Sequence, residues 1–78
     1  MTQEQIIKII EEIMDIDLSN IDHNKKLDTI KEWDSFNSLM LISRLEEEYN
    51  IKFSVKEIED SDTITKIIIL TKGKSNEK

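Results

Sequence analysis

The sequence contains no proline and a single glycine, Gly73, in 78 residues. Tight hairpin turns depend on residues that tolerate positive φ, above all glycine, whereas proline interrupts helices. A chain with almost none of either residue type therefore favours helices over hairpins. The same shortage excludes a glycine-rich phosphate-binding loop and a dinucleotide-binding fingerprint. A chain this short forms one small domain and cannot enclose a deep active site within its own walls.

Local signals predict where the first two helices begin and end. Thr2 and Gln5 fit a capping box, so we expect the first helix to start after Thr2 and to end near Met14. Ser35 is a suitable N-cap for the second helix, and Asn50 suits the left-handed residue that ends it. An apolar stripe runs along this second helix through Phe36, Leu39, Ile42, Leu45 and Tyr49, with Leu41 beside it. We expect Leu41, Leu45 and Tyr49 to face the core and Phe36 to be a partly exposed apolar residue at the first turn.

A short third helix and a longer fourth helix follow in the predicted order. Ser54 and Glu57 form a second capping box, which opens a helix through Ile58. The fourth helix begins after Ser61, Asp62 or Thr63. Its segment Ile67–Ile69 is β-branched and would favour a strand on propensity alone. We predict a helix because its isoleucines share one helical face and a lone strand would lack a partner. The predicted core lining is Leu39, Ile42, Leu45, Ile58, Ile64, Ile67 and Ile68.

The segment from Asp15 to Asp34 has no sustained period and predicts a long loop. Single apolar residues are spread along it, so we expect the loop to be pinned to the core and to have room for a helical turn. The predicted fold is all-α, a small four-helix bundle with three longer helices, one short helix and a long first loop. We expect a domain over residues 1–71 and a flexible basic tail over residues 72–78. The apolar anchors of the loop are Ile16, Leu18, Ile21, Leu27, Ile30 and Trp33.

Charge and composition exclude several kinds of partner and chemistry. The formal charge is −6, which disfavours nucleic acid and anionic membrane surfaces and favours a basic protein surface. No stretch is long enough to span a bilayer and no signal peptide is recognised, so we expect a soluble, cytoplasmic protein. The chain has no cysteine and one histidine, which excludes a thiolate or multi-histidine metal site and a cysteine nucleophile.

The remaining candidates for an enzyme or a metal site are weak. His23 lies in a polar stretch, and we interpret it as a solvated loop residue, not a catalytic base. Asp15, Asp17 and Ser19 match the first positions of a calcium-binding loop, but Asn20 and Lys26 occupy the positions that require glycine and glutamate. The sequence therefore predicts a protein that is not an enzyme and has no metal site.

One motif points to a function. Asp34-Ser35-Phe36 stands at the start of the second helix, and Leu45-Glu46-Glu47-Glu48-Tyr49 stands at its end. At this spacing the sequence resembles the acyl carrier protein family, over roughly residues 3 to 70. The resemblance implies a 4′-phosphopantetheine on Ser35, transferred from coenzyme A by a separate phosphopantetheinyl transferase (holo-ACP synthase). A helix N-terminus tolerates the phosphodiester that this attachment creates.

The resemblance also implies partners and a role. The protein would carry acyl or aminoacyl groups as thioesters, as a monomer, between enzymes that load and transfer them. Asn37, Met40 and Arg44 replace the acidic residues usual in fatty-acid carriers, which favours a specialised pathway over the housekeeping one. The alternative is an unmodified acidic four-helix module for protein interaction or regulation. The predicted partner-binding residues are Asp34, Phe36, Met40, Ser43, Glu46 and Glu47.

Overall fold

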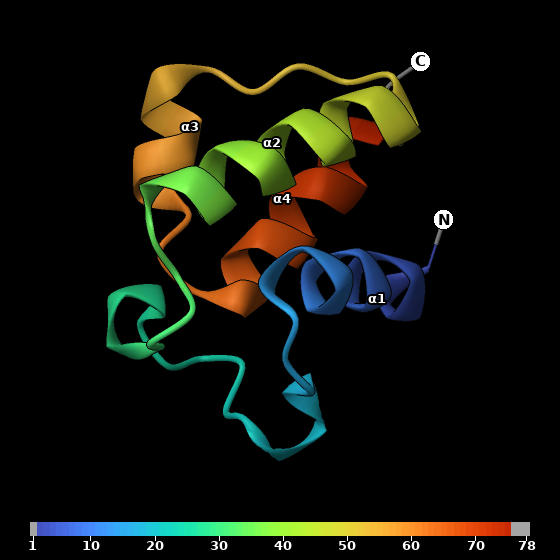
Figure 1. Cartoon of the computed structure of the whole chain (residues 1–78). Helices are drawn as coiled ribbons and strands as arrows, with labels where there is room; N and C mark the ends of the chain where they lie inside the picture. Colours follow the sequence, from blue (N-terminus) through green and yellow to red (C-terminus); the bar gives the residue numbers. More distant parts are fainter. Residues whose placement is uncertain (1, 76–78) are drawn as a thin grey trace.

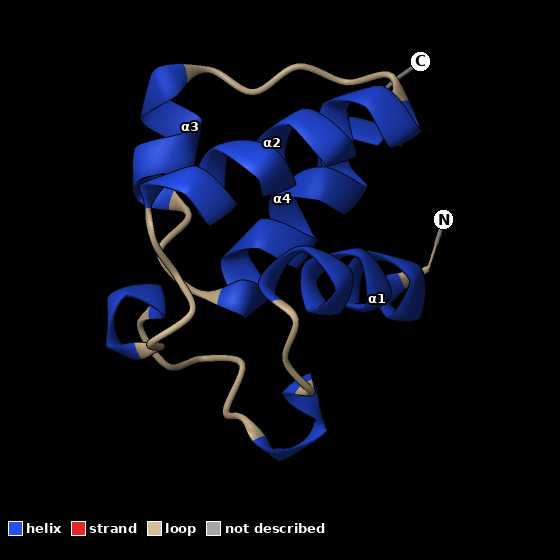
Figure 2. Cartoon of the chain, viewed as in Figure 1, coloured by secondary structure: helices blue, strands red, loops and turns tan. Residues whose placement is uncertain are grey.

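Helices account for the regular structure of residues 2–75, the part of the chain that the computed structural model describes (Figures 1 and 2). This confirms the predicted all-α fold and its order of three longer helices and one short one. A loop with two single turns of 3₁₀-helix, η1 and η2, joins the first two α-helices. The elements are α1 (Gln3–Met14), η1 (Leu18–Asn20), η2 (Leu27–Thr29), α2 (Ser35–Tyr49), α3 (Val55–Asp60) and α4 (Ile64–Ser75).

The caps of α1 and α3 agree with the sequence. Thr2 Oγ1 accepts a hydrogen bond from Gln5 N–H at 3.2 Å, and Gln5 Oε1 accepts one from Thr2 N–H at 2.9 Å. The second capping box, between Ser54 and Glu57, opens α3 in the same way. Each box satisfies backbone donors that a helix start leaves without partners, which is why these two starts could be predicted from local sequence.

The start of α2 differs from the prediction, although its end agrees. Asp34, not Ser35, is the N-cap, and its Oδ1 accepts a hydrogen bond from Asn37 N–H at 2.8 Å. Both residues are good N-caps. The helix starts one residue earlier than predicted, and so Asp34 holds the N-cap position and Ser35 is the first helical residue. Asn50 ends the helix in the left-handed region with φ of 55°, as predicted.

The predicted core side of α2 is partly wrong. Leu41 and Leu45 are fully buried and Phe36 is exposed, as predicted, whereas Leu39, which was predicted to line the core, is exposed. Apolar residues occur on two sides of this helix, and only the side with Leu41 and Leu45 meets the rest of the core, so hydrophobic periodicity alone assigned Leu39 to the core wrongly. Ile42 and Ile58, also predicted to line the core, are only half-buried.

The final helix confirms the prediction of helix over strand and extends it. Thr63 supplies the cap, because its Oγ1 accepts a hydrogen bond from Lys66 N–H at 3.1 Å. The helix continues through Ser75, and Lys74 pairs with Glu57 of α3 at 3.0 Å. Residues 72–75, expected in the tail, are therefore helical, and residues 76–78 lie outside the described part of the chain.

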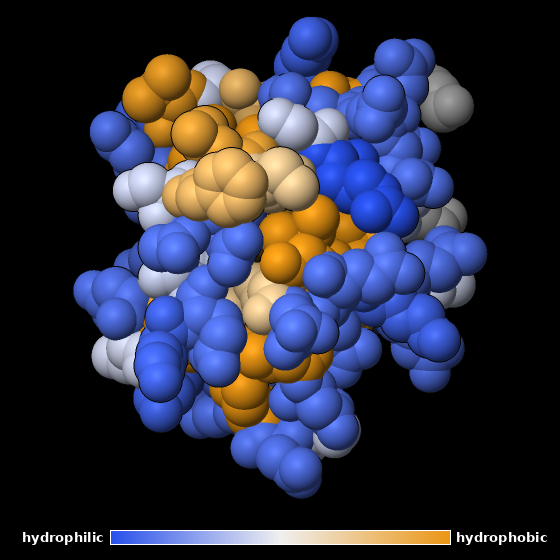
Figure 3. Space-filling model, viewed as in Figure 1, coloured by the Kyte–Doolittle hydropathy of each residue, from blue (hydrophilic) through white to orange (hydrophobic). Residues whose placement is uncertain are grey.

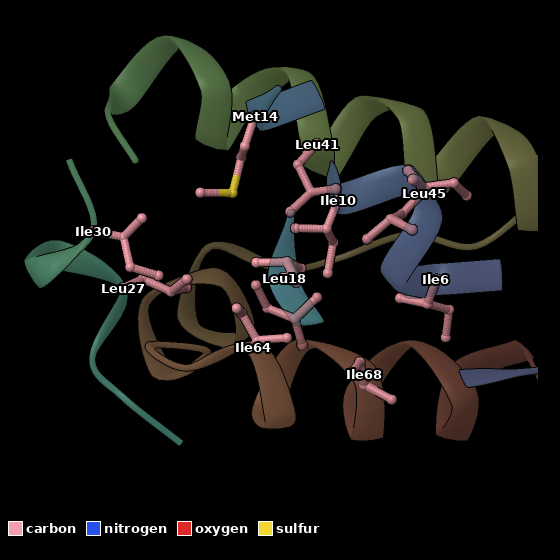
Figure 4. Packing of buried hydrophobic residues seen from close by; sticks show 12 residues of the cluster. Ile6, Ile10, Met14, Leu18, Leu27, Ile30, Leu41, Leu45, Ile64 and Ile68 are labelled. Carbon is pink, nitrogen blue, oxygen red and sulfur yellow. The ribbon is translucent and has the colours of Figure 1, made fainter. Parts of the chain in front are cut away.

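The core lies where α1 packs against both α2 and α4 (Figure 4). Side chains of these three helices meet there with Leu18, Leu27 and Ile30, which the long loop contributes. This confirms a loop pinned by apolar anchors. Burial of single apolar side chains holds the loop although it has little regular structure of its own. The largest fully buried side chains are Ile6, Ile10, Leu18, Leu27, Leu41, Leu45, Ile64 and Thr71.

Hydrogen bonds attach the same loop to the start of α4. Leu27 N–H donates to Asp62 O at 2.8 Å, and Thr65 N–H donates to His23 O at 3.0 Å. The ring Nε2 of His23 lies 3.1 Å from Leu18 O in a half-buried position. His23 is therefore a structural residue of the loop, and its interpretation as a solvated side chain was wrong.

Candidate functional site

Ser35 is the first residue of α2, and its side chain is exposed. Because Asp34 caps the helix, the Ser35 hydroxyl takes no part in capping. Asp34 O also accepts the first intrahelical bond, from Ser38 N–H at 2.9 Å. Among residues 2–75, none forms a hydrogen bond with the Ser35 hydroxyl. The hydroxyl is thus free to react with a group that comes from solvent.

The backbone around Ser35 suits an anionic group. The N–H groups of Ser35 and Phe36 lie in the first turn of a 15-residue helix, where no preceding carbonyl can accept them. The first turn of α2 contains no acidic residue, so the positive end of the helix dipole is offset only by the capping Asp34. A phosphodiester on the Ser35 oxygen would lie beside these donors, so the residues present fit a phosphate-linked prosthetic group.

The segment that leads into α2 is held in place by its neighbours. Asn37 Nδ2 donates to Glu32 O at 2.7 Å, and Trp33 N–H donates to Ile30 O at 3.0 Å. The Trp33 side chain packs against the core while remaining partly exposed. These contacts fix the direction from which the chain enters the helix, and so they fix the position of Ser35.

An open cavity of about 310 Å³ lies next to this site, between the long loop, α2 and α3. Trp33 and Ser38, which line it, lie on either side of Ser35 in the sequence. Its lining also includes the charged residues Lys26 and Asp62. A group attached at Ser35 therefore has a partly polar recess within reach, at the lower end of the volume range of ligand pockets.

An ion pair joins two of the residues that line this cavity, Lys26 and Asp62. Asp62 accepts hydrogen bonds from the ammonium groups of Lys26 and Lys66, the latter at 2.9 Å. These two donors lower the pKa of Asp62 from 3.8 to about 2. The carboxylate is therefore charged at neutral pH, and the pair with Lys26 joins the long loop to the start of α4.

The predicted partner-binding residues fall into two groups. Phe36, Met40, Ser43 and Glu47 are exposed along one side of α2, as the spacing predicted. Asp34 and Glu46 instead have structural contacts: Asp34 is the cap, and Glu46 Oε2 accepts a hydrogen bond from Phe53 N–H at 2.9 Å.

Sequence analysis missed two exposed apolar residues near this surface. Leu39 was assigned to the core, and Val55 of α3 was not considered. A signal for Leu39 was available, since it lies three residues after Phe36 and therefore on the same side of the helix. No sequence signal indicated Val55, because its neighbourhood depends on how α3 lies against α2.

Residues 2–75 contain neither a cluster of metal-binding side chains nor a helix that could span a membrane. In this range, no group of three or more histidine, cysteine, aspartate or glutamate side chains is arranged so that it could hold a metal ion. In the same range, no helix has the length and apolar character needed to cross a membrane.

The fold and the helix-terminal serine define a small carrier domain, and comparison with known proteins identifies its family. Residues 4–70 match the family described as "Phosphopantetheine attachment site", and the chain belongs to this family. A solution NMR structure of holo acyl carrier protein from Geobacter metallireducens superposes with a TM-score of 0.79 at 26% identity, over 94% of this chain and 84% of that one. No curated protein gave a significant match.

The function follows at the level of the family. The chain is an acyl carrier protein, and its cofactor is a covalently attached 4′-phosphopantetheine. Carriers of this family are typically not catalysts themselves. They work with a phosphopantetheinyl transferase and with enzymes that handle acyl groups.

Proposed function

We propose that Ser35 is the residue that carries 4′-phosphopantetheine. The observation that supports this most is the division of roles at the start of α2. Asp34 caps the helix, which leaves the exposed Ser35 hydroxyl without a partner in the described part of the chain. Ser38, the nearest other serine, is half-buried and lines the adjacent cavity, so it is a poorer acceptor for a large group.

The residues around Ser35 would hold and orient the group. The attached arm supplies a terminal thiol, on which an acyl or aminoacyl group is carried as a thioester. The Ser35 oxygen would anchor the arm, and the N–H groups of Ser35 and Phe36, which have no helical acceptor, would be available to its phosphate. The cavity beside Trp33 and Ser38 offers a partly sheltered surface to whatever the arm carries.

The carboxylate adjacent to Ser35, that of Asp34, is engaged in capping α2, where its Oδ1 accepts a hydrogen bond from Asn37 N–H. The single histidine of the chain, His23, has a ring nitrogen 3.1 Å from Leu18 O, within the long loop. Activation of Ser35 therefore comes from the transferase, and the carrier itself is not an enzyme. Its role is to present the thioester to separate loading and transferring enzymes.

The charge pattern of α2 supports a specialised pathway. Asn37 and Met40 bring no negative charge to the first half of the helix. Arg44 is held by Glu12 at 3.2 Å and by Glu48 at 3.4 Å, so two acidic residues are engaged within the chain. Enzymes that select a carrier by a strongly acidic helix would find less charge here. The monomeric state and the cytoplasmic location stay predictions from the sequence.

Incubation with coenzyme A, Mg²⁺ and a phosphopantetheinyl transferase of broad specificity tests the attachment, with intact mass as the readout. The wild type and Ser38→Ala should each gain one phosphopantetheine, and Ser35→Ala should gain none. Full modification of Ser35→Ala would refute the assignment. An unmodified wild type would favour the alternative function, an acidic four-helix interaction module.

A further inference from the structure

Asn37 makes two hydrogen bonds that bridge across Ser35. Its backbone N–H donates to Asp34 Oδ1 at 2.8 Å, and its side-chain Nδ2 donates to Glu32 O at 2.7 Å. Both acceptors precede Ser35 in the chain, so Asn37 closes residues 32–37 into a loop that contains the serine. We call this pair of hydrogen bonds the Asn37 clamp.

The Asn37 clamp is not a capping box. In a capping box, the third helical residue is a glutamate or glutamine that accepts from the N-cap backbone N–H. Asn37 is the third residue of α2, but its side chain reaches past the cap and donates to the carbonyl of Glu32. A carbonyl oxygen can only accept, so this bond requires the amide N–H of asparagine, and an ionised aspartate at this position has no donor to offer.

Few other contacts hold the segment that leads into Ser35. Residues 31–34 belong to no helix or strand, and Trp33 is half-buried against the core. Figure 3 shows mainly apolar surface over the first half of α2, in the upper left of the view, where Phe36, Leu39 and Met40 are exposed. Apolar side chains form no hydrogen bonds. In the described chain, the Asn37 clamp and Trp33 therefore hold this segment.

We propose that Asn37 is a positioning residue for phosphopantetheine attachment, because the clamp holds the Ser35 oxygen in the orientation in which it reacts. The inference rests on the proposed attachment at Ser35 and adds a residue that sets its rate. In the transfer, the Ser35 oxygen bonds to the phosphorus of the phosphopantetheine unit and the pyrophosphate bond of coenzyme A breaks. Adenosine 3′,5′-bisphosphate leaves, and the serine proton passes to the transferase. A reacting atom that is already held in place loses less conformational freedom on reaching this geometry.

Single-turnover modification of the full chain tests this proposal, with coenzyme A, Mg²⁺ and excess phosphopantetheinyl transferase in high salt and intact mass as the readout. Asn37→Ala and Asn37→Asp both remove the amide donor. We expect each to lower the rate at saturating transferase about fivefold, equivalent to about 1 kcal/mol. The transferase concentration at half saturation should change little, since high salt screens the added charge of Asn37→Asp.

Asn24→Ala and Asn24→Asp are the matched controls. Asn24 is exposed in the long loop, and its side chain forms no hydrogen bond within residues 2–75. Both controls make the same chemical change as the variants of Asn37, and both should be modified at the wild-type rate. Circular dichroism first confirms that every variant has the wild-type helix content.

Two further measurements separate positioning from stability. An acid near a helix N-terminus is favourable, so Asn37→Asp should be more stable than Asn37→Ala in urea unfolding. If Asn37 acted only through the stability of α2, Asn37→Asp would then react faster, whereas loss of the clamp makes both equally slow. Trp33 is the only tryptophan of the chain and lies within the clamped segment. Acrylamide quenching of its fluorescence should therefore increase in both variants.

The outcomes keep this inference apart from the attachment itself. A modified wild type with unchanged rates in both variants of Asn37 would overturn the positioning role and leave Ser35 in place. A wild-type rate in Asn37→Asp alone would overturn it too, because the clamp is lost there as well. Equal slowing by the Asn24 controls would have the same consequence. A wild type that gains no mass would instead refute the attachment at Ser35.

Discussion

Asp34 and Ser35 are adjacent residues that both suit an N-cap, and the structure gives them different tasks. The acid satisfies Asn37 N–H at 2.8 Å, and the serine hydroxyl stays free. A shift of one residue in the helix start would exchange these roles and tie up the hydroxyl in capping. If Ser35 carries the arm as proposed, its free hydroxyl depends on the good cap immediately before it.

This division of roles predicts the stability of two alanine variants. Ser35→Ala should change the free energy of unfolding by less than about 0.5 kcal/mol, the range for exposed sites without a special role. Asp34→Ala should lower it by about 1 kcal/mol, because a cap is lost. Urea unfolding followed by circular dichroism measures both. Equal destabilisation by the two variants would mean that Ser35 does contribute to the cap.

Thr71 provides a second prediction at this scale. It is fully buried in α4, and its Oγ1 has no hydrogen-bond partner in the described chain. Thr71→Val keeps the shape and removes the unsatisfied hydroxyl, so we expect the free energy of unfolding to rise by about 1 kcal/mol. Thr63→Val is the control and should be destabilising, since Thr63 Oγ1 caps α4. A loss of stability in both variants would contradict this account of Thr71.

At the scale of elements, the features that could be predicted from the sequence are those set by residues close together in the chain, such as helix caps. The starts of α1 and α3 follow from capping boxes, and Asn50 ends α2 as expected. Leu41 and Leu45 face the core as predicted, but Leu39 was placed there wrongly, because apolar residues lie on two sides of α2 and only tertiary packing selects between them. The role of Glu46 was missed for a similar reason, since its partner, Phe53 N–H, lies in the loop after the helix.

The same distinction applies to the candidate site. Ser35 and its motif are contiguous in sequence, so the resemblance identified them. The cavity and Val55 were not predicted, because they depend on how the long loop, α2 and α3 come together. Residues far apart in the chain build these features, and a single sequence carries no periodic signal for them.

The contact between the long loop and α4 predicts a pH dependence of stability. The pKa of Asp62 is lowered to about 2 by hydrogen bonds from Lys26 and Lys66. A carboxylate with a depressed pKa stabilises the fold above its unfolded value, and this contribution is lost as pH falls from about 4 towards about 2. Asp62→Asn should therefore be less stable than the wild type at neutral pH, and the difference should shrink in acid.

Urea unfolding across this pH range measures that difference. Asp60→Asn is the control, because Asp60 pairs with Lys56 at 3.3 Å within α3 and joins no separate segments. Exposed pairs of this kind contribute about 0–1 kcal/mol, so the control should show little change at any pH. A wild-type advantage over Asp62→Asn that stays constant down to about pH 2 would contradict the role given to this carboxylate.

At the scale of the whole molecule, the net charge of −6 predicts sensitivity to ions. Repulsion among acids destabilises a compact state, and cations that screen or bind them relieve it. Addition of Mg²⁺ at low ionic strength should raise the thermal midpoint by several degrees, since about 1 kcal/mol shifts a small domain by about 4–8 °C. Thermal scans with and without the ion measure this. An unchanged midpoint would show that self-repulsion is unimportant.

The same charge should steer partners towards the carrier. Glu47 is exposed on the side of α2 that carries Met40, so Glu47→Lys should lower kcat/KM for modification severalfold at low salt and less at high salt. Glu4→Lys on α1 makes the same change in net charge far from Ser35 in the sequence. The kcat/KM values of the two variants should differ at low salt and become similar at high salt. Equal effects of both would indicate a response to net charge alone.

The most direct test of the central claim is to locate the modification and its cargo on the protein itself. The protein is co-expressed with a phosphopantetheinyl transferase, and the intact chain is fragmented in a mass spectrometer before and after hydroxylamine treatment, which cleaves thioesters. We predict one phosphopantetheine, on Ser35, and an acyl or aminoacyl mass that hydroxylamine removes. A phosphopantetheine on another residue, or a chain that stays unmodified beside an active transferase, would contradict the claim.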